Sequence, residues 1–307
     1  MTPELEIQLR TAVNSVPGWI WEDVEVAPLD GGVTNTNFVA IHRGKKHFLK
    51  VYGPGTESFI NRDGSNDAAL QAHAMGIGPK VLRYDNETGL EVIEFLEGYR
   101  ASTNADYARK EFLEHVIDLY STFHSSKPLL YTKNVFEMTE EHIEQGTELS
   151  VHRPVDFDWL YKQYRKAKSA FFASGLDLVP CHNDPMPGNF MVTMADDAIT
   201  DMKLIDYEYA SNNERAYELG VFLAEVFVDE QTSLEMIERY FGEVRPQIVA
   251  RVTVARAVAD MKWGSWAVQQ RKLQDWDFDY QKYGIWKYAR ARMMFNDPRW
   301  DDWLRAI

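Results

Sequence analysis

The chain has 307 residues, of which 45% are hydrophobic and 13% aromatic, and its formal net charge is −14. This length suits two domains or lobes, and the composition excludes long disordered segments. The acidic balance opposes non-specific binding to nucleic acid or to an anionic membrane surface, and it is compatible with a cationic small-molecule substrate. Cys181 is the only cysteine, so a disulfide framework is excluded and a reducing, cytoplasmic location is expected.

The N-terminal segment predicts a helix and not a targeting signal. Thr2-Pro3-Glu4 places proline at the first helical position and an acid in the first turn, and an apolar face follows at Leu5, Leu9, Ala12 and Val13. No apolar run in the chain approaches the ~20 residues of a membrane span, so we expect no insertion into a membrane.

Residues from about 22 to 98 predict a small antiparallel sheet with one helix over 60–75. Runs of β-branched, aromatic and other apolar residues, separated by turns, predict strands at 24–26, 37–41, 47–52, 81–82 and 90–95. Glu97-Gly98 breaks this pattern. Beyond it the chain is predicted to be mainly helical, with helices at 105–125, 155–174, 215–228, 231–241, 247–270 and 279–294.

Two segments, at 181–189 and 204–206, carry three groups that a phosphoryl-transfer site needs. Asp184 is a carboxylate that can accept a hydroxyl proton, and Asn189 offers a neutral oxygen to a metal ion. Asp206 ends an apolar run that predicts a buried strand, the usual platform for a Mg²⁺-binding carboxylate. The second carboxylate makes the combination more specific than a loose H-x-D-x-x-x-x-N match. The alternative is that these residues only shape a turn and cap a strand.

A glycine turn and a strand lysine predict the phosphate end of the site. The turn between the first two strands contains Gly31, Gly32, Thr34 and Asn35, and its successive N–H groups can face a phosphate. Because it is neither a P-loop nor G-x-G-x-x-G, a purely structural hairpin turn is the alternative. Lys50 lies in an apolar strand, from which a lysine can reach the α- and β-phosphate oxygens.

A series of short motifs occurs along most of the chain: Gly31-Gly32, Lys50-Val51-Tyr52-Gly53, Ile60-Asn61-Arg62, Gly76-Ile77-Gly78-Pro79, His182-Asn183-Asp184, Asn189, Ile205-Asp206-Tyr207-Glu208-Tyr209 and Trp263-Gly264-Ser265-Trp266. With these motifs the chain resembles the choline/ethanolamine kinases over about residues 25–295. That family belongs to the wider aminoglycoside-phosphotransferase-like group with a protein-kinase-like fold. The last two motifs point to the choline/ethanolamine branch.

The element pattern predicts an α+β fold of two lobes, and the resemblance implies that it is protein-kinase-like. We expect a nucleotide-binding lobe over 1–95 and a helical catalytic and acceptor-binding lobe over 96–307, joined near 94–98. The resemblance implies ATP and Mg²⁺ as cofactors, with the backbone from Glu94 to Leu96 taking the adenine edge. It also implies that His182 supports the loop of the catalytic base.

One position departs from the family's pattern. The family places a Glu three residues after the Arg of its Ile-Asx-Arg segment, where it pairs with the strand Lys or Arg. This chain has Ser65 there. Asp67 lies about 200° further around the helix and would need a register shift to take that place. We therefore expect Lys50 to lack its orienting carboxylate.

The C-terminal helices are rich in aromatic residues. Trp263 and Trp266, three positions apart, share a helix face, and aromatic faces attract quaternary ammonium groups by roughly 0.5–2 kcal/mol each. Packing in the helix core is the alternative. With the resemblance, the predicted acceptor-binding residues are Glu208, Glu225, Trp263, Trp266, Tyr280 and Tyr283.

The leading hypothesis is an ATP-dependent kinase that phosphorylates the hydroxyl of choline or a related amino alcohol such as ethanolamine. A second hypothesis keeps this chemistry but changes the acceptor to an aminoglycoside, thiamine or another amino-bearing alcohol. A third, motivated by Ser65, is a ligand-binding pseudokinase, against which the retention of Asp184, Asn189 and Asp206 argues. No feature of the sequence indicates an oligomeric state or a pathway.

Overall fold

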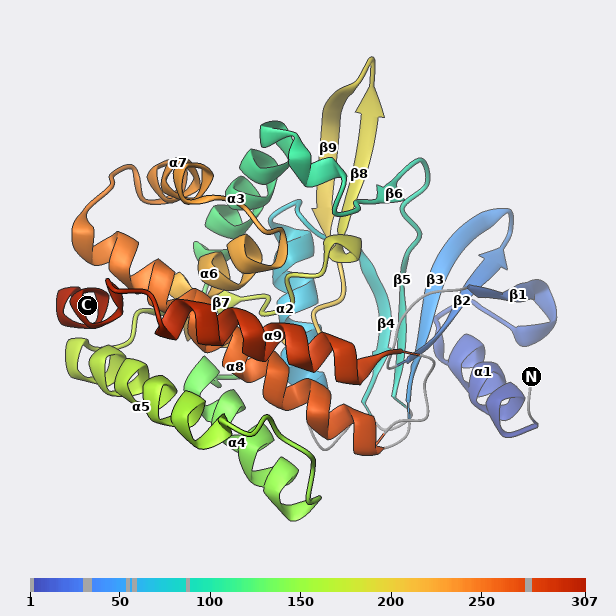
Figure 1. Ribbon diagram of the computed structural model, residues 1–307. Coiled ribbons are helices and arrows are strands. Elements are labelled where there is room, and N and C mark those ends of the chain that lie inside the picture. Colours follow the sequence, from blue (N-terminus) through green and yellow to red (C-terminus); the bar gives the residue numbers. More distant parts are fainter. Residues whose placement is uncertain (1–2, 30–34, 54–55, 57–59, 87–88, 274–277) are drawn as a thin grey trace. The chain divides into compact units, whose positions relative to one another are not determined.

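The computed structural model describes residues 3–29, 35–53, 56, 60–86, 89–273 and 278–307 (Figure 1). Backbone contacts divide the chain into two compact units. The first comprises Met1–Ser102, Leu129–Tyr131 and Gly188–Ala210, and the second comprises Thr103–Pro128, Thr132–Pro187 and Ser211–Ile307. The first unit therefore includes two segments that lie beyond the boundary expected near residue 95.

The first unit is built on a five-stranded antiparallel sheet in the order β1-β2-β3-β5-β4. Helix α1 (Pro3–Ser15) packs against the apolar face of this sheet, as Figure 1 shows. Leu9 and Val13 of the helix are buried in one hydrophobic cluster with Phe38 and Leu49 of the sheet. The five strands, each close to an expected one, are β1 (Val24–Leu29), β2 (Asn35–His42), β3 (Lys45–Tyr52), β4 (Val81–Asp85) and β5 (Leu90–Glu94).

Helix α2 (Arg62–Ala74) also belongs to the first unit and starts two residues after the expected position. The start is set by Asn61, whose side chain accepts a hydrogen bond of 2.8 Å from the Gly64 N–H and so caps the helix. The helix is followed by Gly76 at φ +75°, a left-handed conformation that glycine adopts without strain.

The first unit has a second sheet, and two of its strands connect the motif segments at 181–189 and 204–206. It has the order β6-β8-β9, with β6 (Arg100–Ala101), β8 (Phe190–Ala195) and β9 (Ala198–Leu204). The β8–β9 hairpin turns at Asp196 and Asp197, which have φ +49° and +63°, the backbone that a tight hairpin requires. This hairpin brings the beginning of β8 beside the end of β9, since Phe190 pairs with Leu204.

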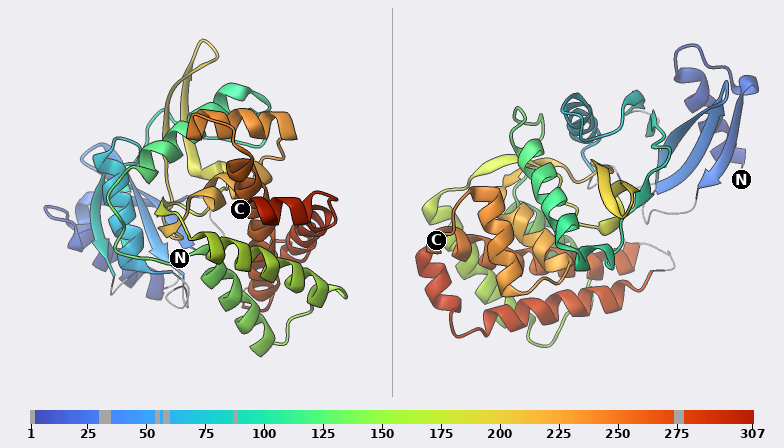
Figure 2. Two further views of the ribbon diagram at one scale, coloured as in Figure 1. Left: turned by 90° about the vertical axis from the view of Figure 1, so that its left-hand side faces the viewer. Right: turned by 90° about the horizontal axis from the view of Figure 1, so that it is seen from above.

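The second unit is mainly helical, and the two views in Figure 2 show its helices gathered around α8. Helix α8 packs against α4, α5, α6, α9 and α10. One short antiparallel sheet pairs β7 (Leu178–Cys181), which precedes the two motif segments in the chain, with β10 (Ser211–Glu214), which follows them. The helices are α3 (Lys110–His124), α4 (Val135–Glu148), α5 (Phe157–Ser174), α6 (Arg215–Glu225), α7 (Glu230–Phe241), α8 (Pro246–Leu273), α9 (Tyr280–Phe295) and α10 (Trp300–Ala306).

Three elements differ from the sequence-based expectation. The helix expected at 105–125 is divided, with the 3₁₀ turn η3 (Asp106–Ala108) separated from α3 by Arg109, whose backbone is extended. Helices α4 and α10 were not expected. Helix α4 begins with a capping box formed by Asn134 and Glu137, a signal that is present in the sequence. None of the helices in the described residues is long and apolar enough to span a membrane.

Candidate active site

Asp184 lies in the loop after β7, in the second unit, and is only 6% exposed. Its carboxylate accepts a hydrogen bond of 3.2 Å from the N–H of Met186, which fixes the side chain over its own loop. His182 is fully buried, and its Nδ1 lies 3.0 Å from the carbonyl oxygen of Asp184. The imidazole thus contacts the backbone of the predicted base.

Glu218 of α6 also holds this loop. This residue was not predicted from the sequence. The fully buried Glu218 carboxylate accepts hydrogen bonds from the backbone N–H groups of His182, at 2.5 Å, and Asn183, at 2.8 Å. Asn183 has φ +69°, a strained conformation for a non-glycine residue, and its side chain is tied to Ser211 and Asn213. An acid inside an otherwise apolar helix was the available signal for Glu218.

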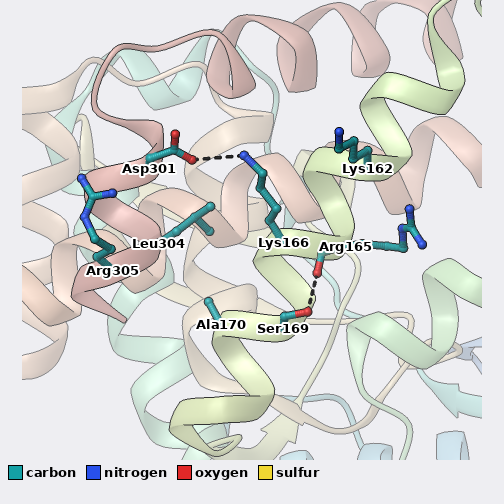
Figure 3. Close-up of a pocket in the computed structure, with 8 residues that line it drawn as sticks. All are labelled: Lys162, Arg165, Lys166, Ser169, Ala170, Asp301, Leu304 and Arg305. Carbon is teal, nitrogen blue, oxygen red and sulfur yellow. Dashed lines mark hydrogen bonds and ion pairs between the residues drawn. The ribbon is translucent and has the colours of Figure 1, made fainter.

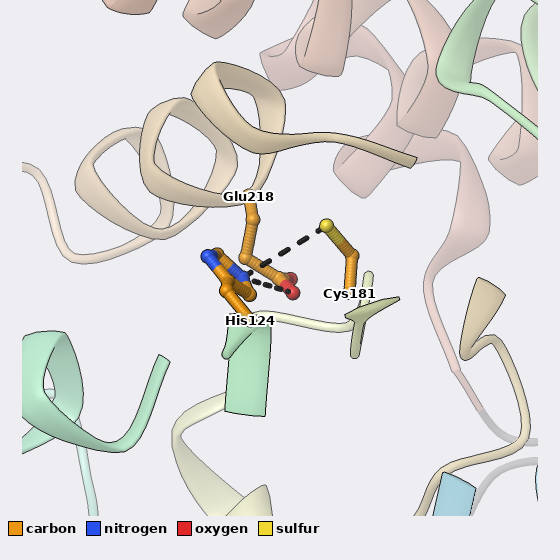
Figure 4. Close-up of side chains that lie close together, drawn as sticks. All are labelled: His124, Cys181 and Glu218. Carbon is orange, nitrogen blue, oxygen red and sulfur yellow. Dashed lines mark hydrogen bonds and ion pairs between the residues drawn. The ribbon is translucent and has the colours of Figure 1, made fainter. Parts of the chain in front are cut away.

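Glu218 also lies beside His124 and Cys181, and Figure 4 shows the three side chains together. The His124 Nε2 is 3.4 Å from Glu218 and 3.9 Å from the Cys181 sulfur. Burial raises the pKa of the Cys181 thiol well above its usual value, which disfavours a reactive or metal-binding thiolate. Cys181 therefore packs in the core as a free, buried thiol.

Asn189 and Asp206, the predicted metal ligands, lie together in the first unit. The N–H of Ile205 donates to the carbonyl oxygen of Asn189 at 3.0 Å, so the two residues are joined through the ends of the β8–β9 hairpin. Asp206 has φ +66°. This is the left-handed region, which aspartate adopts more readily than most non-glycine residues. Asp184 is separated from Asn189 by only five positions in the chain.

Lys50 is paired with Asp206, so the expectation that it lacks a carboxylate partner is wrong. Its Nζ lies 2.5 Å from Asp206 Oδ1, and Lys50 is 5% exposed. Burial alone would lower the pKa of Lys50, but the charges of Asp206 and other nearby acids raise it well above its ordinary value. Glu91 is one of these acids, directly opposite Lys50 in the β3–β5 register and 8% exposed.

The helix residues considered as partners of Lys50 are engaged elsewhere. Asp63 accepts a hydrogen bond from Asn86, and Asp67 accepts one from Gln71. Ser65 is buried at 4% exposure. The ion-pair partner of Lys50 is therefore Asp206 and not an acid of α2, which sequence spacing along the helix could not reveal because the pairing depends on tertiary structure.

Two predicted residues from different ends of the site contact each other. Asn35, expected at the phosphate end, donates a hydrogen bond of 2.7 Å to Glu208, expected at the acceptor end. Both are buried in the first unit, so Glu208 is placed with the nucleotide-side residues. The predicted phosphate-loop residues Gly31, Gly32 and Thr34 lie outside the described residues.

The predicted adenine edge lies at the end of β5. The Glu94 side chain accepts a hydrogen bond of 3.2 Å from the Lys80 N–H, and the Glu94 N–H donates to the Lys80 carbonyl at 2.8 Å. The carbonyl oxygen of Leu96 accepts from the Tyr99 N–H at 3.3 Å.

The four predicted acceptor-binding aromatic residues form one cluster in the second unit. The Trp266 ring centroid lies 5.3 Å from Trp263, 5.7 Å from Tyr280 and 6.1 Å from Tyr283. All three contacts are edge-to-face, a favourable geometry for aromatic pairs. The structure thus brings these aromatic residues of α8 and α9 together.

Protein cations lie against this aromatic cluster. Glu225, the predicted acceptor-binding carboxylate, forms an ion pair with Lys287. The Lys287 Nζ also lies 4.8 Å from the Tyr283 ring centroid, and the Lys262 Nζ lies 3.0 Å from that of Trp263. Neither lysine was predicted. Their signal is the occurrence of charged residues at buried helix positions.

A surface pocket of about 650 Å³, drawn in Figure 3, contains none of the predicted site residues. It lies between α5 and α10, where Lys166 forms an ion pair with Asp301. Its lining residues are Lys162, Arg165, Lys166, Ser169, Ala170, Asp301, Leu304 and Arg305.

Comparison with known proteins identifies the family. A family model described as choline/ethanolamine kinase matches residues 26–247, well over half of the chain. The chain belongs to the choline/ethanolamine kinase family. It is a phosphotransferase with an alcohol group as acceptor, and small-molecule kinase activity follows from the family match.

Relatives and solved structures agree with this family. A probable ethanolamine kinase of Arabidopsis thaliana is 24% identical over 271 residues, covering 78% of this chain and 70% of that protein. A choline/ethanolamine kinase family protein from Mesorhizobium loti has a TM-score of 0.82 at 24% identity and covers 98% of both chains. LicA in complex with AMP has a TM-score of 0.77 at 21% identity, covering 96% of this chain and 99% of that one. Aminoglycoside phosphotransferases are more distant structural neighbours, and the protein-kinase-like α+β fold is confirmed.

Proposed function

We propose that this kinase uses ATP and Mg²⁺ to phosphorylate the hydroxyl of choline or a related amino alcohol such as ethanolamine. The observation that carries the proposal is the buried pairing of Lys50 with Asp206, a left-handed residue that is tied to Asn189 through Ile205. A cation-binding carboxylate, an amide oxygen and a phosphate-binding lysine are the parts of a nucleotide site. The similarity to LicA, solved with AMP, supports a nucleotide as phosphoryl donor.

The residues present fit Mg²⁺, which prefers oxygen ligands from carboxylates, amides and phosphates. Asp206 would bind it through its carboxylate and Asn189 through its amide oxygen. The ion would neutralise charge on the β- and γ-phosphates. Lys50 then adds a fixed positive charge for the phosphate oxygens, and we assign the remaining phosphate contacts to Gly31, Gly32, Thr34 and Asn35.

Asp184 is the proposed base that orients the acceptor hydroxyl and accepts its proton. Its loop is rigid because Glu218 binds two of its N–H groups and His182 contacts its backbone. Since phosphoryl transfer asks little covalent chemistry of the protein, this fixed placement contributes directly to the rate. We assign nucleotide binding to residues 1–95, with the backbone at Glu94 and Leu96 at the adenine edge, and acceptor binding to 96–307.

The aromatic cluster of α8 and α9 supports an amine-bearing acceptor, because aromatic faces attract ammonium groups. We assign acceptor recognition to Trp263, Trp266, Tyr280 and Tyr283, with Glu225 as the nearby carboxylate. Glu208, which accepts a hydrogen bond from Asn35 in the first unit, is assigned to the nucleotide side instead. A cytoplasmic location agrees with the single buried cysteine.

The proposal is tested by measuring ADP release from MgATP with choline, ethanolamine, thiamine and kanamycin in parallel. We expect turnover with at least one of the first two and none above background with kanamycin. Preferential use of thiamine or kanamycin would replace the acceptor assignment. Absence of ADP release with all four, despite measurable ATP binding, would overturn the proposed reaction.

A further inference from the structure

The groups expected to bind the acceptor's ammonium are already in contact with two lysines of the protein. Lys262 of α8 is 1% exposed, and its Nζ lies 3.0 Å from the Trp263 ring centroid. Lys287 of α9 covers Tyr283 at 4.8 Å and forms an ion pair with Glu225. At 3.0 Å the Lys262 amino group is in direct contact with the ring, so the ammonium of an acceptor cannot occupy that face.

We infer that Lys262 is a specificity-determining residue of the acceptor site, which selects a primary-amine alcohol over a quaternary-ammonium alcohol. The inference rests on the proposed function and narrows its substrate class. A quaternary ammonium has no N–H group, so its recognition depends on ring faces and on Coulomb attraction. Covering Trp263 removes one of those faces. A primary ammonium is smaller and donates three hydrogen bonds. Covering the ring therefore weakens its binding less than the binding of a quaternary ammonium.

The same cluster offers a hydrogen-bond acceptor that only a primary ammonium can use. Within the part of the chain that the structure describes, the Tyr280 hydroxyl has no hydrogen-bond partner, and Tyr280 is 3% exposed. Tyr280 lies in the cluster through its contact with Trp266. A buried polar group without a partner is costly, and an N–H donor from the acceptor would satisfy it.

The charge of Lys262 does not reverse this preference. Electrostatic repulsion acts on both kinds of ammonium and largely cancels from their ratio, since specificity is a difference between two affinities. Burial, together with Lys287 and Lys133, lowers the pKa of Lys262 well below its ordinary value, against the opposing effect of Asp184. An uncharged Lys262 amine would accept a hydrogen bond from a primary ammonium, which a quaternary one cannot donate.

The test is the ratio of kcat/KM for choline to kcat/KM for ethanolamine. Lys262→Met removes the amine but keeps an unbranched apolar chain, and we expect the ratio to rise at least tenfold. Lys262→Arg keeps a nitrogen group over the ring and should retain the parent ratio. Lys282→Met is the matched control, because Lys282 lies 4.9 Å over the exposed ring of Trp286, outside the cluster. It should leave the ratio within twofold of the parent.

The outcomes separate this inference from the proposed function. If the parent enzyme uses both alcohols but Lys262→Met leaves the ratio within twofold, the inference fails and the kinase assignment stands. A parent enzyme that prefers choline by tenfold or more would also overturn it. If the parent uses neither alcohol, the acceptor assignment fails and the inference with it. If Lys262→Met does not fold, calorimetric titration of choline into Lys262→Leu and into the parent gives the same comparison. We expect choline to bind the variant more tightly than the parent, and unchanged binding would contradict the inference.

Discussion

At the scale of single residues, the nucleotide side of the site depends on one buried lysine between two acids. Lys50 contacts Asp206 directly and faces Glu91 across the β3–β5 pair. Burial raises the pKa of Glu91, while the nearby Lys50 charge lowers it. We infer that a cation on Asp206 would leave Glu91 as the nearby acid opposite Lys50. Glu91 would then be a positioning residue that acts through the lysine.

We predict that Glu91→Gln raises the KM for ATP about tenfold, corresponding to ~1.4 kcal/mol, with a smaller effect on the KM for the acceptor. The shape of the side chain is kept, so the loss reflects the charge. Glu91→Asp should restore part of the affinity. Glu97→Gln is the control, because Glu97 also faces a β3 lysine, Lys46 at 4.0 Å, but the pair is exposed and worth little.

A double-mutant cycle with Lys50→Met tests the coupling itself. If Glu91→Gln has the same effect on ATP affinity with and without Lys50, the two residues act independently and the positioning role is excluded.

At the scale of elements, α6 supplies both the support of the proposed catalytic loop and the carboxylate beside the proposed acceptor cluster. Glu218 and Glu225 lie on this helix, which packs closely on α8 at Gly220. A Cβ at Gly220 would meet the Arg256 N and the Val252 carbonyl oxygen of α8 at 3.0 Å. Because both are backbone atoms, they cannot yield without moving the helix.

We predict that Gly220→Ala destabilises the protein by roughly 1–3 kcal/mol through this overpacking, despite the higher helix propensity of alanine. Thermal unfolding of Gly220→Ala and of Gly146→Ala checks it. Gly146 lies in α4, where a Cβ would meet only side-chain atoms of Arg153 and Val151, so its variant should lose less. Equal stability of Gly220→Ala and the parent would show that α6 and α8 can separate without cost.

The elements also show what the sequence could predict. The five strands of the first sheet were recognisable because alternation and turns are local signals, and the family because the spacing of its motifs is fixed in the chain. Glu91 and Lys262 were not recognised as site residues, since their roles arise from a strand register and from the face that α8 presents to its neighbours. The pairing of Lys50 was wrong for the same reason: the partner comes from other segments, Asp206 above all.

At the scale of the whole molecule, the net charge of −14 contrasts with the cations inside the second unit. His142 is buried beside Lys262 and Lys133, and its Nδ1 lies 2.7 Å from the Gln269 amide oxygen. Burial, reinforced by the two lysines, lowers its pKa to about 3. In the unfolded chain His142 therefore binds a proton as the pH falls through about 6.5, whereas in the folded chain it stays neutral at that pH.

This linkage predicts a loss of stability as the pH falls below about 6.5, amounting to ~2 kcal/mol from His142 at pH 5. His142→Gln keeps a hydrogen-bonding side chain but cannot titrate. Urea unfolding of both proteins at pH 7.5 and pH 5.0 measures the difference. The variant should lose about 2 kcal/mol less than the parent over this interval, and an equal loss would show that His142 is not buried in its neutral form.

The central claim is phosphoryl transfer to an amino-alcohol hydroxyl with Asp184 as base, and ³¹P NMR of the reaction tests it most directly. With MgATP and ethanolamine or choline, the parent should give a phosphomonoester signal equal in amount to the ADP formed. Asp184→Asn keeps the size of the side chain but removes the base, and it should reduce product formation by about 10²–10⁴-fold. ADP formed without a phosphomonoester, or product from Asp184→Asn within a few-fold of the parent, would contradict the account.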